Sequence, residues 1–389
     1  MCDERFVSLV RCPSYEAQAV RDALENLLLP YGMLDFVKPD MKVAVKANLV
    51  AMMRPEQAAT THPALLCALT DMLRERGATV TIGDSPGGLF TPVFVERIYA
   101  AAGMKEAEAH GATLNQNFET AQAVFPEAVS AQTFEYTAWL KEADVIINFC
   151  KLKSHGMMGM SACAKNMFGA VPGTTKMEYH YRFPDAMKFA NMIVDLDEYF
   201  KPVLSIADAV VGMEGNGPTA GKPKAMSALI ASRSPHAADI VCASIIGIDP
   251  LSVPTIRAAA DRGLVCADIK SIDCSAPVGE FAVKDFSVVS ARTDLTMGAN
   301  LKGPIGKIVK GFLHKTLEVR PKLQPKECIG CGKCARICPA RAITMNADRK
   351  PVIDRNVCIK CFCCQEFCEK GAMKAHRSAL LKLIQRSNN

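Results

Sequence analysis

The sequence predicts an α/β fold for residues 1–300 and a separate, smaller unit at the C-terminal end, and three observations support this division. Short apolar runs alternate with amphipathic segments through the first part, as in a mainly parallel sheet with helices on both faces. Nine of the 17 cysteines fall within residues 328–368. Residues 301–389 have 19 basic and 6 acidic side chains, whereas residues 1–300 have 27 and 34. A length of 389 residues allows two or three domains of ordinary size.

The elements expected in the first hundred residues follow from hydrophobic periodicity and from the residues at their ends. Residues 15–28 repeat apolar side chains at helical spacing, and residues 42–46 predict a strand. A helix begins at Pro63, where the missing N–H is tolerated, and ends by Arg76, before Gly77. The next expected elements are a short buried strand at 79–84 and a helix at about 92–102.

The same alternation continues to about residue 295. Apolar runs at 144–149, 203–207 and 228–231 predict further strands, and residues 236–246 predict a helix. Lysines and glycines then alternate along the chain, which is typical of a basic linker. We expect this linker over residues 301–321, leading into the cysteine-rich unit.

Composition excludes several classes of protein. The chain is 49% hydrophobic and 22% charged, which is close to the globular average and is not typical of disorder. No run reaches the roughly 18 apolar residues of a membrane-spanning helix, and the first residues lack a signal-peptide pattern, so we expect a cytoplasmic protein with free thiols. One Trp and seven Tyr leave few stacking platforms, which argues against nucleic acid as a partner although the tail is basic.

The cysteines of the C-terminal unit form two runs of one pattern, C-x2-C-x2-C-x3-C, which start 30 residues apart. This is the spacing of bacterial two-cluster ferredoxins, in which the fourth cysteine of each run ligates the other cluster. One [4Fe-4S] cluster is therefore expected on Cys328, Cys331, Cys334 and Cys368. The second [4Fe-4S] cluster is expected on Cys358, Cys361, Cys364 and Cys338. The segment at about 322–375 resembles these ferredoxins, which implies a small α+β domain over 322–389 that passes single electrons and ends in a basic helix.

Structural zinc is the alternative for these cysteines, but zinc sites favour two separated pairs of ligands. Two departures from the ferredoxin pattern occur in the second run. Glu369 stands where a proline usually follows the fourth cysteine, and Cys363 is an additional thiol. We expect Cys363 to be a small packing residue rather than a ligand.

Polar side chains gather where the predicted strands of the first domain end, and the carboxyl ends of parallel strands meet at one edge of a sheet. We expect them to face one crevice whose chemistry is mainly cationic and suits a carboxylate or a phosphate. The expected ligand- or cofactor-binding groups are Lys46, Asn48, His62, Lys151, Asn166 and Asn216. The expected catalytic groups, with acid/base or metal chemistry, are Lys153, His155, Lys165, Asp84 and Glu214. Lys176 adds a further cation, and no Rossmann or Walker A glycine motif indicates a nucleotide.

Taken singly, each of these residues has an ordinary structural explanation, such as a solvated lysine, a hydrogen-bonded histidine or a turn cap. Their order is more specific, because the chain contains in sequence Val45-Lys46-Ala-Asn48-Leu49, Thr60-Thr61-His62-Pro63, Gly83-Asp84-Ser85-Pro86-Gly87, Lys151-Leu-Lys153-Ser-His155, Lys165-Asn166-Met-Phe168-Gly169 and Met213-Glu214-Gly-Asn216-Gly-Pro218. Over about residues 40–290 these motifs resemble the family called domain of unknown function 362. The resemblance implies one α/β ligand-binding unit fused to a ferredoxin module, and it assigns no substrate.

Three functions stay open at this point. In the first, the α/β domain binds an anionic small molecule and the two [4Fe-4S] clusters exchange single electrons with it, as in a ferredoxin-fused oxidoreductase. In the second, the chain is a non-enzymatic electron carrier that docks on a redox complex. In the third, it is a metallocofactor maturation factor in which histidines with Cys150 and Cys163 hold metal. The expected partner is a redox protein such as a ferredoxin, a flavodoxin or a reductase, and exposed clusters suit an anaerobic cell.

Overall fold

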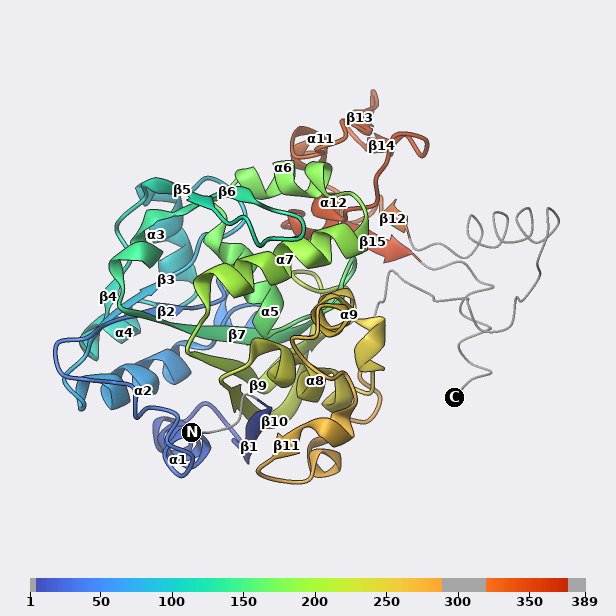
Figure 1. The fold of residues 1–389 in the computed structure, drawn as a ribbon. Helices are drawn as coiled ribbons and strands as arrows, with labels where there is room; N and C mark the ends of the chain where they lie inside the picture. Colours follow the sequence, from blue (N-terminus) through green and yellow to red (C-terminus); the bar gives the residue numbers. More distant parts are fainter. Residues whose placement is uncertain (1–4, 289–319, 377–389) are drawn as a thin grey trace.

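The structure is a computed structural model that describes residues 5–288 and 320–376 (Figure 1). The basic linker expected over 301–321 lies outside the described residues except for Arg320 and Pro321, which begin a strand rather than end a linker. The expected basic C-terminal helix also lies outside the described part of the chain.

A nine-stranded sheet forms the centre of the first domain, in the order β11-β1-β10-β9-β7-β2-β3-β4, with β8 paired to β7. The strands from β9 to β4 run parallel, whereas β10 is antiparallel to both β1 and β9. The sheet is thus mainly parallel, as predicted. Its strands are β1 Phe6–Arg11, β2 Lys42–Lys46, β3 Thr79–Gly83, β4 Thr113–Leu114, β7 Val145–His155, β8 Gly159–Ser161, β9 Leu204–Glu214, β10 Lys222–Ser232 and β11 Asp273–Cys274. A separate hairpin pairs β5 Thr120–Val124 with β6 Thr133–Thr137.

Helices cover both faces of this sheet, which confirms the predicted α/β class. Alternate residues of β7 belong to different cores: Phe149 packs with α1 and α2, whereas Leu152 packs with α8. The helices of the domain are α1 Ala17–Leu28, α2 Pro63–Arg74, α3 Pro92–Ala101, α4 Glu106–Ala109, α5 Cys163–Asn166, α6 Thr175–Arg182, α7 Ala186–Phe200, α8 Pro235–Ile245 and α9 Pro254–Asp261. Short 3-10 helices lie at Pro55–Gln57, Ala138–Glu142, Met167–Ala170, Pro250–Ser252, Ile269–Ser271 and Val278–Phe281.

Three central strands are longer than the apolar runs that predicted them, since β7, β9 and β10 each have 11 residues. In β7 the apolar run ends at Phe149, yet the strand continues through Lys151 and Lys153, which are both buried. Their ammonium groups are bonded inside the protein, so the strand extends without apolar side chains at these positions. These extensions carry polar groups beyond the centre of the sheet.

The cysteine-rich unit consists of two similar halves. Its strands are β12 Arg320–Leu323, β13 Ile343–Met345, β14 Pro351–Ile353 and β15 Met373–His376, and its short helices are α11 Lys333–Arg336 and α12 Cys363–Glu366. The strands form two antiparallel pairs, β12 with β15 and β13 with β14. Each helix follows a residue in the left-handed region, Gly332 with φ 70° and Phe362 with φ 61°. A glycine adopts this conformation readily, whereas Phe362 needs a compensating contact.

That contact is with the α/β domain. The side chain of Phe362 is buried within the core that contains Met157, Met158 and Phe189. Figure 1 shows α12 and β15 beside the α/β domain, whereas α11, β13 and β14 lie farther out. The second half of the cysteine-rich unit is therefore the half that docks.

Candidate functional site

A small cavity lies where the carboxyl ends of the parallel strands meet the second cysteine run. Its volume is about 50 Å³. The lining combines residues of the α/β domain with one residue of α12: Asn48, Val50, Asp84, Ser85, Gly87, Lys153, Ser161, Lys165, Asn166, Phe168, Gly169, Lys176, Pro218 and Glu366. Five of the expected binding and catalytic residues are in this lining, namely Asn48, Asp84, Lys153, Lys165 and Asn166, and the further cation Lys176 lines it as well.

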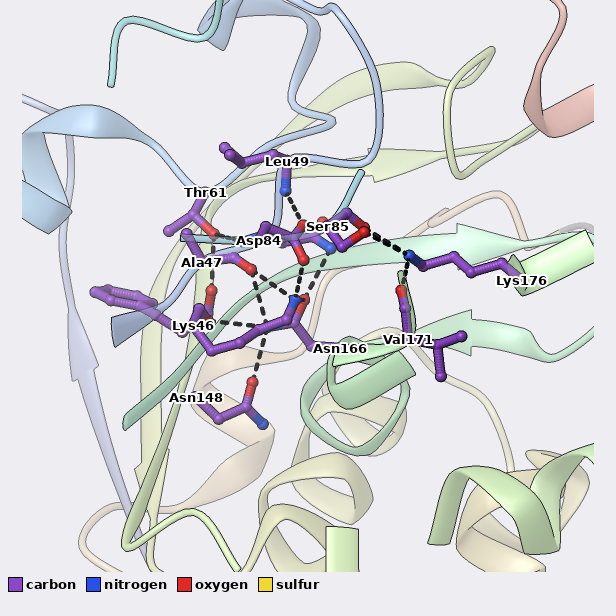
Figure 2. A network of polar contacts seen from close by, with 12 residues as sticks. Lys46, Ala47, Leu49, Thr61, Asp84, Ser85, Asn148, Asn166, Val171 and Lys176 are labelled. Carbon is purple, nitrogen blue, oxygen red and sulfur yellow. Dashed lines mark hydrogen bonds and ion pairs between the residues drawn. The ribbon is translucent and has the colours of Figure 1, made fainter. Parts of the chain in front are cut away.

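A buried ion pair forms the floor of the cavity (Figure 2). Lys46 Nζ lies 2.6 Å from Asp84 Oδ1, and both side chains are almost fully buried. The other carboxylate oxygen accepts a hydrogen bond from the Leu49 N–H at 2.7 Å. Burial lowers the pKa of Lys46, and the carboxylate of Asp84 opposes that shift. Lys46 itself does not line the cavity, because this ion pair holds its charge beneath it.

Asn166 fixes the relative positions of the groups at this floor. Its Oδ1 accepts from Lys46 Nζ at 3.0 Å and from Asn48 Nδ2 at 2.8 Å. Its Nδ2 donates to Asn148 Oδ1 at 2.7 Å (Figure 2). Every polar atom of the Asn166 amide is therefore occupied, so we assign it a positioning role.

Lys153, Lys165 and Lys176 bring positive charge to the cavity walls. Lys153 Nζ donates to Asn48 Oδ1 and, at 2.6 Å, to the carbonyl of Ala59. Burial lowers the pKa of Lys153 to about 7, and the charge of nearby Lys165 acts in the same direction. Lys165 Nζ lies 6.0 Å from the centre of the Phe168 ring, and burial lowers its pKa as well.

Lys176 is held from the opposite wall. Its Nζ donates to the Ser85 carbonyl at 2.7 Å, to Ser85 Oγ at 3.3 Å and to the Val171 carbonyl (Figure 2). Burial lowers its pKa to about 7. Among the described residues, none forms an ion pair with Lys153, Lys165 or Lys176.

The charges around the cavity favour an anion. The Asp84 carboxylate is matched by Lys46, which leaves Glu366 as the acidic lining group that faces three lysines. Positive groups held in a buried space attract an anionic group strongly, because the local dielectric is low. A volume of about 50 Å³ accommodates one small oxyanion or one carboxylate or phosphate group of a larger molecule.

Two of the expected binding residues form a different network. Lys151 Nζ lies 2.7 Å from Asp208 Oδ2 and 2.8 Å from the hydroxyl of Tyr15. His62 stacks on the Tyr15 ring with centroids 3.6 Å apart, and its Nδ1 accepts from the Ala64 N–H at the start of α2. Burial lowers the pKa of His62 to about 4. Neither Lys151 nor His62 lines the cavity, and both have structural partners.

Three further candidates lie at the edges of the site. His155 is buried and its Nδ1 accepts from the N–H groups of Met157 and Met158, both at 3.1 Å. Glu214 accepts from the Ser287 N–H at 2.9 Å. Asn216 binds the cysteine-rich unit, because its Oδ1 accepts from the Ala375 N–H at 3.2 Å. None of these three residues lines the cavity.

The first cysteine run surrounds a larger cavity of about 230 Å³. Cys328, Cys331, Cys334 and Cys368 all line it, so the fourth cysteine of the second run joins the first three of the first run. Four thiol donors around one such space fit a [4Fe-4S] group.

The first three cysteines of the second run lie near the fourth cysteine of the first run, Cys338. Burial and the neighbouring Cys361, Cys358, Cys334 and Cys338 raise the pKa of the Cys364 thiol. The two fourth cysteines are equivalent, since Cys338 Sγ accepts from the Ala342 N–H and Cys368 Sγ from the Ala372 N–H, each at 3.2 Å. Cys363 is fully buried. Within residues 5–288 and 320–376, no three His, Cys, Asp or Glu side chains converge closely enough to hold a single metal ion.

Sequence reasoning missed the contribution of α12. Glu366 lies between two expected cluster ligands, and no local signal indicated that it would line a cavity of the other domain. Its neighbour Gln365 donates to the carbonyls of Asn216 at 3.2 Å and Gly217 at 3.3 Å. Thr219 Oγ1 donates to the Glu366 carbonyl at 2.8 Å. The glycine-rich loop that follows β9 therefore serves to dock the cysteine-rich unit.

Comparison with known proteins agrees with this division of the chain. The profile described as Domain of unknown function (DUF362) matches residues 43–244, and that described as 4Fe-4S binding domain matches residues 321–344. None of the helices described is long and apolar enough to cross a membrane.

Two relatives and one solved structure are similar to the chain. The thylakoid-associated protein sll1697 of Synechocystis is 35% identical over 268 residues, which are 67% of this chain and 80% of that protein. Protein MJ0749 of Methanocaldococcus jannaschii is 34% identical over 70 residues, 18% of this chain and 26% of that protein. The lactate racemase apoprotein of Thermoanaerobacterium thermosaccharolyticum aligns with a TM-score of 0.38 at 15% identity, covering 62% of this chain and 58% of that one. By the extent of the profile match and the first of these relatives, the chain belongs to the DUF362 family and has a 4Fe-4S binding domain attached.

Proposed function

We propose that the chain holds two [4Fe-4S] clusters and exchanges single electrons between them and an anionic small molecule bound at the strand ends of the α/β domain. The observation that carries this proposal is the shared cavity, in which Lys153, Lys165 and Lys176 face Glu366 of the second cysteine run. A ligand in this cavity would lie directly against α12, which contains the expected cluster ligand Cys364 and follows Cys358 and Cys361.

The residues of the chain have distinct tasks in this proposal. The three lysines hold the anionic group of the ligand, and Asn48 and Asn166 keep Lys153 and the Lys46–Asp84 pair in position. Phe168 and Pro218 close the walls of the cavity and limit access of water. The first ligand set is Cys328, Cys331, Cys334 and Cys368, and the second is Cys358, Cys361, Cys364 and Cys338. When bound, [4Fe-4S] groups supply one-electron chemistry at a potential set by their surroundings.

A second candidate is an electron carrier without a small ligand. This alternative is favoured by one observation, since Lys153 and Lys176 already donate to carbonyl and amide oxygens of the protein itself. In that case the lysines and asparagines would serve only to shape the surface on which α12 docks.

Native mass spectrometry of protein purified without oxygen tests the proposal. We expect the mass of two [4Fe-4S] clusters and an additional mass from a retained anionic ligand. The double variant Lys153→Met with Lys176→Met is expected to lose the ligand and keep the clusters. The matched control is Lys188→Met, at an exposed position of α7, which is expected to keep both.

The outcomes separate the two candidates. Purified protein can be exposed to sulfate or acetate before the measurement, so that a ligand lost during purification is replaced by a small anion. A wild-type chain that binds neither anion under these conditions contradicts the ligand site and favours the carrier. We further propose a cytoplasmic location and a redox partner protein that supplies or removes the electrons.

A further inference from the structure

The two cysteine runs differ in their exposure to solvent. In the second run, Cys361 and Cys364 are buried, and the side chain between them at Phe362 is inserted into the α/β domain. In the first run, Cys331 is exposed and Ile329 is 64% exposed. Figure 1 shows the same asymmetry, with α11 and β13 on the outer side of the cysteine-rich unit.

Basic side chains surround the exposed run. Lys333, Arg336 and Lys370 all line its cavity, together with Ile329 and the acidic Glu369. Glu369 is engaged by Lys333, with Nζ and Oε1 2.7 Å apart. In the described part of the chain, no carboxylate pairs with Arg336 or Lys370. We name this surface, made of Ile329, Cys331, Lys333, Arg336 and Lys370, the outer face.

More positive charge lies beyond the outer face. Lys326, Arg341 and Arg349 are exposed on the same small unit. The described residues 320–376 include 12 lysines and arginines against 5 aspartates and glutamates. The outer face thus presents an apolar residue ringed by cations, beside thiols that line a cavity open to solvent.

We propose that the outer face docks an acidic one-electron carrier protein, and that electrons enter or leave the chain there through the group bound by the first cysteine run. This inference rests on the proposed function and names its partner class and the end of the relay at which the partner docks. One electron leaves the reduced carrier and one is accepted at the first run, or the reverse, with no bond formed and no proton transferred.

Charge and exposure together support a protein partner. An apolar centre with a charged rim is the usual composition of a transient protein interface, and opposite charge accelerates the encounter. The second run is less accessible to a partner, because Cys361 and Cys364 are buried and Phe362 is inserted into the α/β domain. In this arrangement the carrier docks beside the first cysteine run, and the second run lies against the cavity. Electrons then pass between the carrier and the cavity through the two runs in turn.

Oxidised and reduced flavodoxin, an acidic one-electron carrier, is the probe in the test. Stopped-flow absorbance measures the rate of electron transfer to the full-length holoprotein at low and high ionic strength. The double variant Arg336→Glu with Lys370→Glu is compared with Lys38→Glu, which changes an exposed lysine in the turn before β2. We expect the double variant to lower the rate constant at low salt by about tenfold or more, and the control by less than about twofold.

Carbodiimide cross-linking provides a readout that does not depend on electron transfer. Oxidised flavodoxin is expected to cross-link to Lys333 and Lys370, and added salt is expected to weaken the cross-links. Cross-links confined to the α/β domain, or equal rates for all three proteins, overturn the inference. Loss of binding to double-stranded DNA or to anionic vesicles in the same variants, with no effect on flavodoxin, overturns it as well.

Two precautions keep the test interpretable. Arg336 donates to the Cys331 carbonyl at 3.0 Å, so the charge-neutral pair Arg336→Gln with Lys370→Gln is measured alongside, and the visible spectrum reports cluster content. Sulfate binding at the cavity is measured in the same variants. If the wild-type protein binds sulfate but neither cross-links to flavodoxin nor exchanges electrons with it, this inference fails and the proposed function stands. If the wild-type protein docks flavodoxin and binds no anion, the reverse holds.

Discussion

Gly87 of the α/β domain lies so close to the ring of Phe367 that a Cβ atom at position 87 would be 2.7 Å from Phe367 Cε1. Gly87 also lines the small cavity at the strand ends, and Phe367 lines the cavity of the first cysteine run. This contact joins one residue from the lining of each cavity, and it requires the absence of a side chain at position 87.

Substituting this glycine should loosen the docked unit. We expect Gly87→Ala to displace Phe367 and to raise hydrogen exchange over residues 361–367, while the cluster absorbance stays unchanged. The matched control is Gly279→Ala, because a Cβ there meets nothing within 4 Å. Equal hydrogen exchange in the two variants would show that the ring of Phe367 moves aside without destabilising the docked unit.

The Lys46–Asp84 pair should contribute to stability as a unit. Lys46→Met leaves the buried Asp84 carboxylate without its partner, and loss of one member of such a pair costs about 3–5 kcal/mol. We expect a lowered midpoint in thermal unfolding, and a smaller loss in the double variant Lys46→Met with Asp84→Asn. Lys105→Met, which removes an exposed pair with Glu96, is the control and should change little. A Lys46→Met protein as stable as the control would contradict the assignment.

The affinity of the cavity for anions should fall as the pH rises through about 7. Burial lowers the pKa of Lys153 and of Lys176 to about 7, so both ammonium groups lose their charge above that pH. We expect sulfate, whose charge is constant in this range, to bind about tenfold or more weakly at pH 9 than at pH 6, by isothermal titration calorimetry. The charges of Lys165 and Glu366 also act on the pKa of Lys153. The pKa of Lys176 is affected by the charges of Asp84, Lys46, Glu366 and Lys165.

The same pKa shifts determine whether the stability of the folded protein rises or falls with pH. In the unfolded chain these lysines keep their protons to about pH 10.4, so between about pH 7 and that value the unfolded state binds more protons and the stability contributed by this region rises with pH. Ligand affinity and stability of the ligand-free protein should therefore change in opposite directions. A sulfate affinity that is flat from pH 6 to 9 would show that the lysines stay charged.

Iron content should distinguish the extra thiol of the second run, Cys363, from the expected cluster ligands. Cys331→Ser is expected to lower the iron content of anaerobically purified protein by about half, if each run holds three ligands of one cluster. Cys363→Ser is expected to retain the iron, because Cys363 is fully buried and is not needed to complete either set of four. Iron is measured by inductively coupled plasma mass spectrometry against protein concentration. Equal losses in the two variants would make Cys363 a ligand.

Hydrophobic periodicity was sufficient to predict the fold class and the positions of most central elements. The helix expected at 92–102 is α3, Pro92–Ala101, and the strand at 42–46 is β2. The length of β7 was not predictable in the same way, because the buried Lys151 is bonded by Asp208 and Tyr15, which lie 57 and 136 residues away in the sequence. Short strands such as β4 and β11 have two residues each and carry no pattern of their own.

The sequence predicted the chemistry of the site better than it predicted which residues line it. Strand ends predicted that Asp84, Asn48 and Lys153 would meet, and they line one cavity. His62 directly precedes α2 and Lys151 lies within β7, and the ring of Tyr15 and the carboxylate of Asp208 engage them away from the cavity. Such pairings depend on side chains brought together by folding, which local spacing does not reveal. The wall formed by Glu366 depends in addition on how the two domains meet.

The shared wall has a thermodynamic consequence. Because Glu366 lies on α12 together with the expected ligand Cys364 and also lines the cavity at the strand ends, occupancy of one proposed site would change the free energy of binding at the other. Linkage is reciprocal, so whatever factor a cavity ligand contributes to the retention of iron, iron contributes the same factor to the retention of the ligand. Loss of iron to oxygen would then also release the small molecule, and a cell rich in that molecule would protect the protein from oxidative damage.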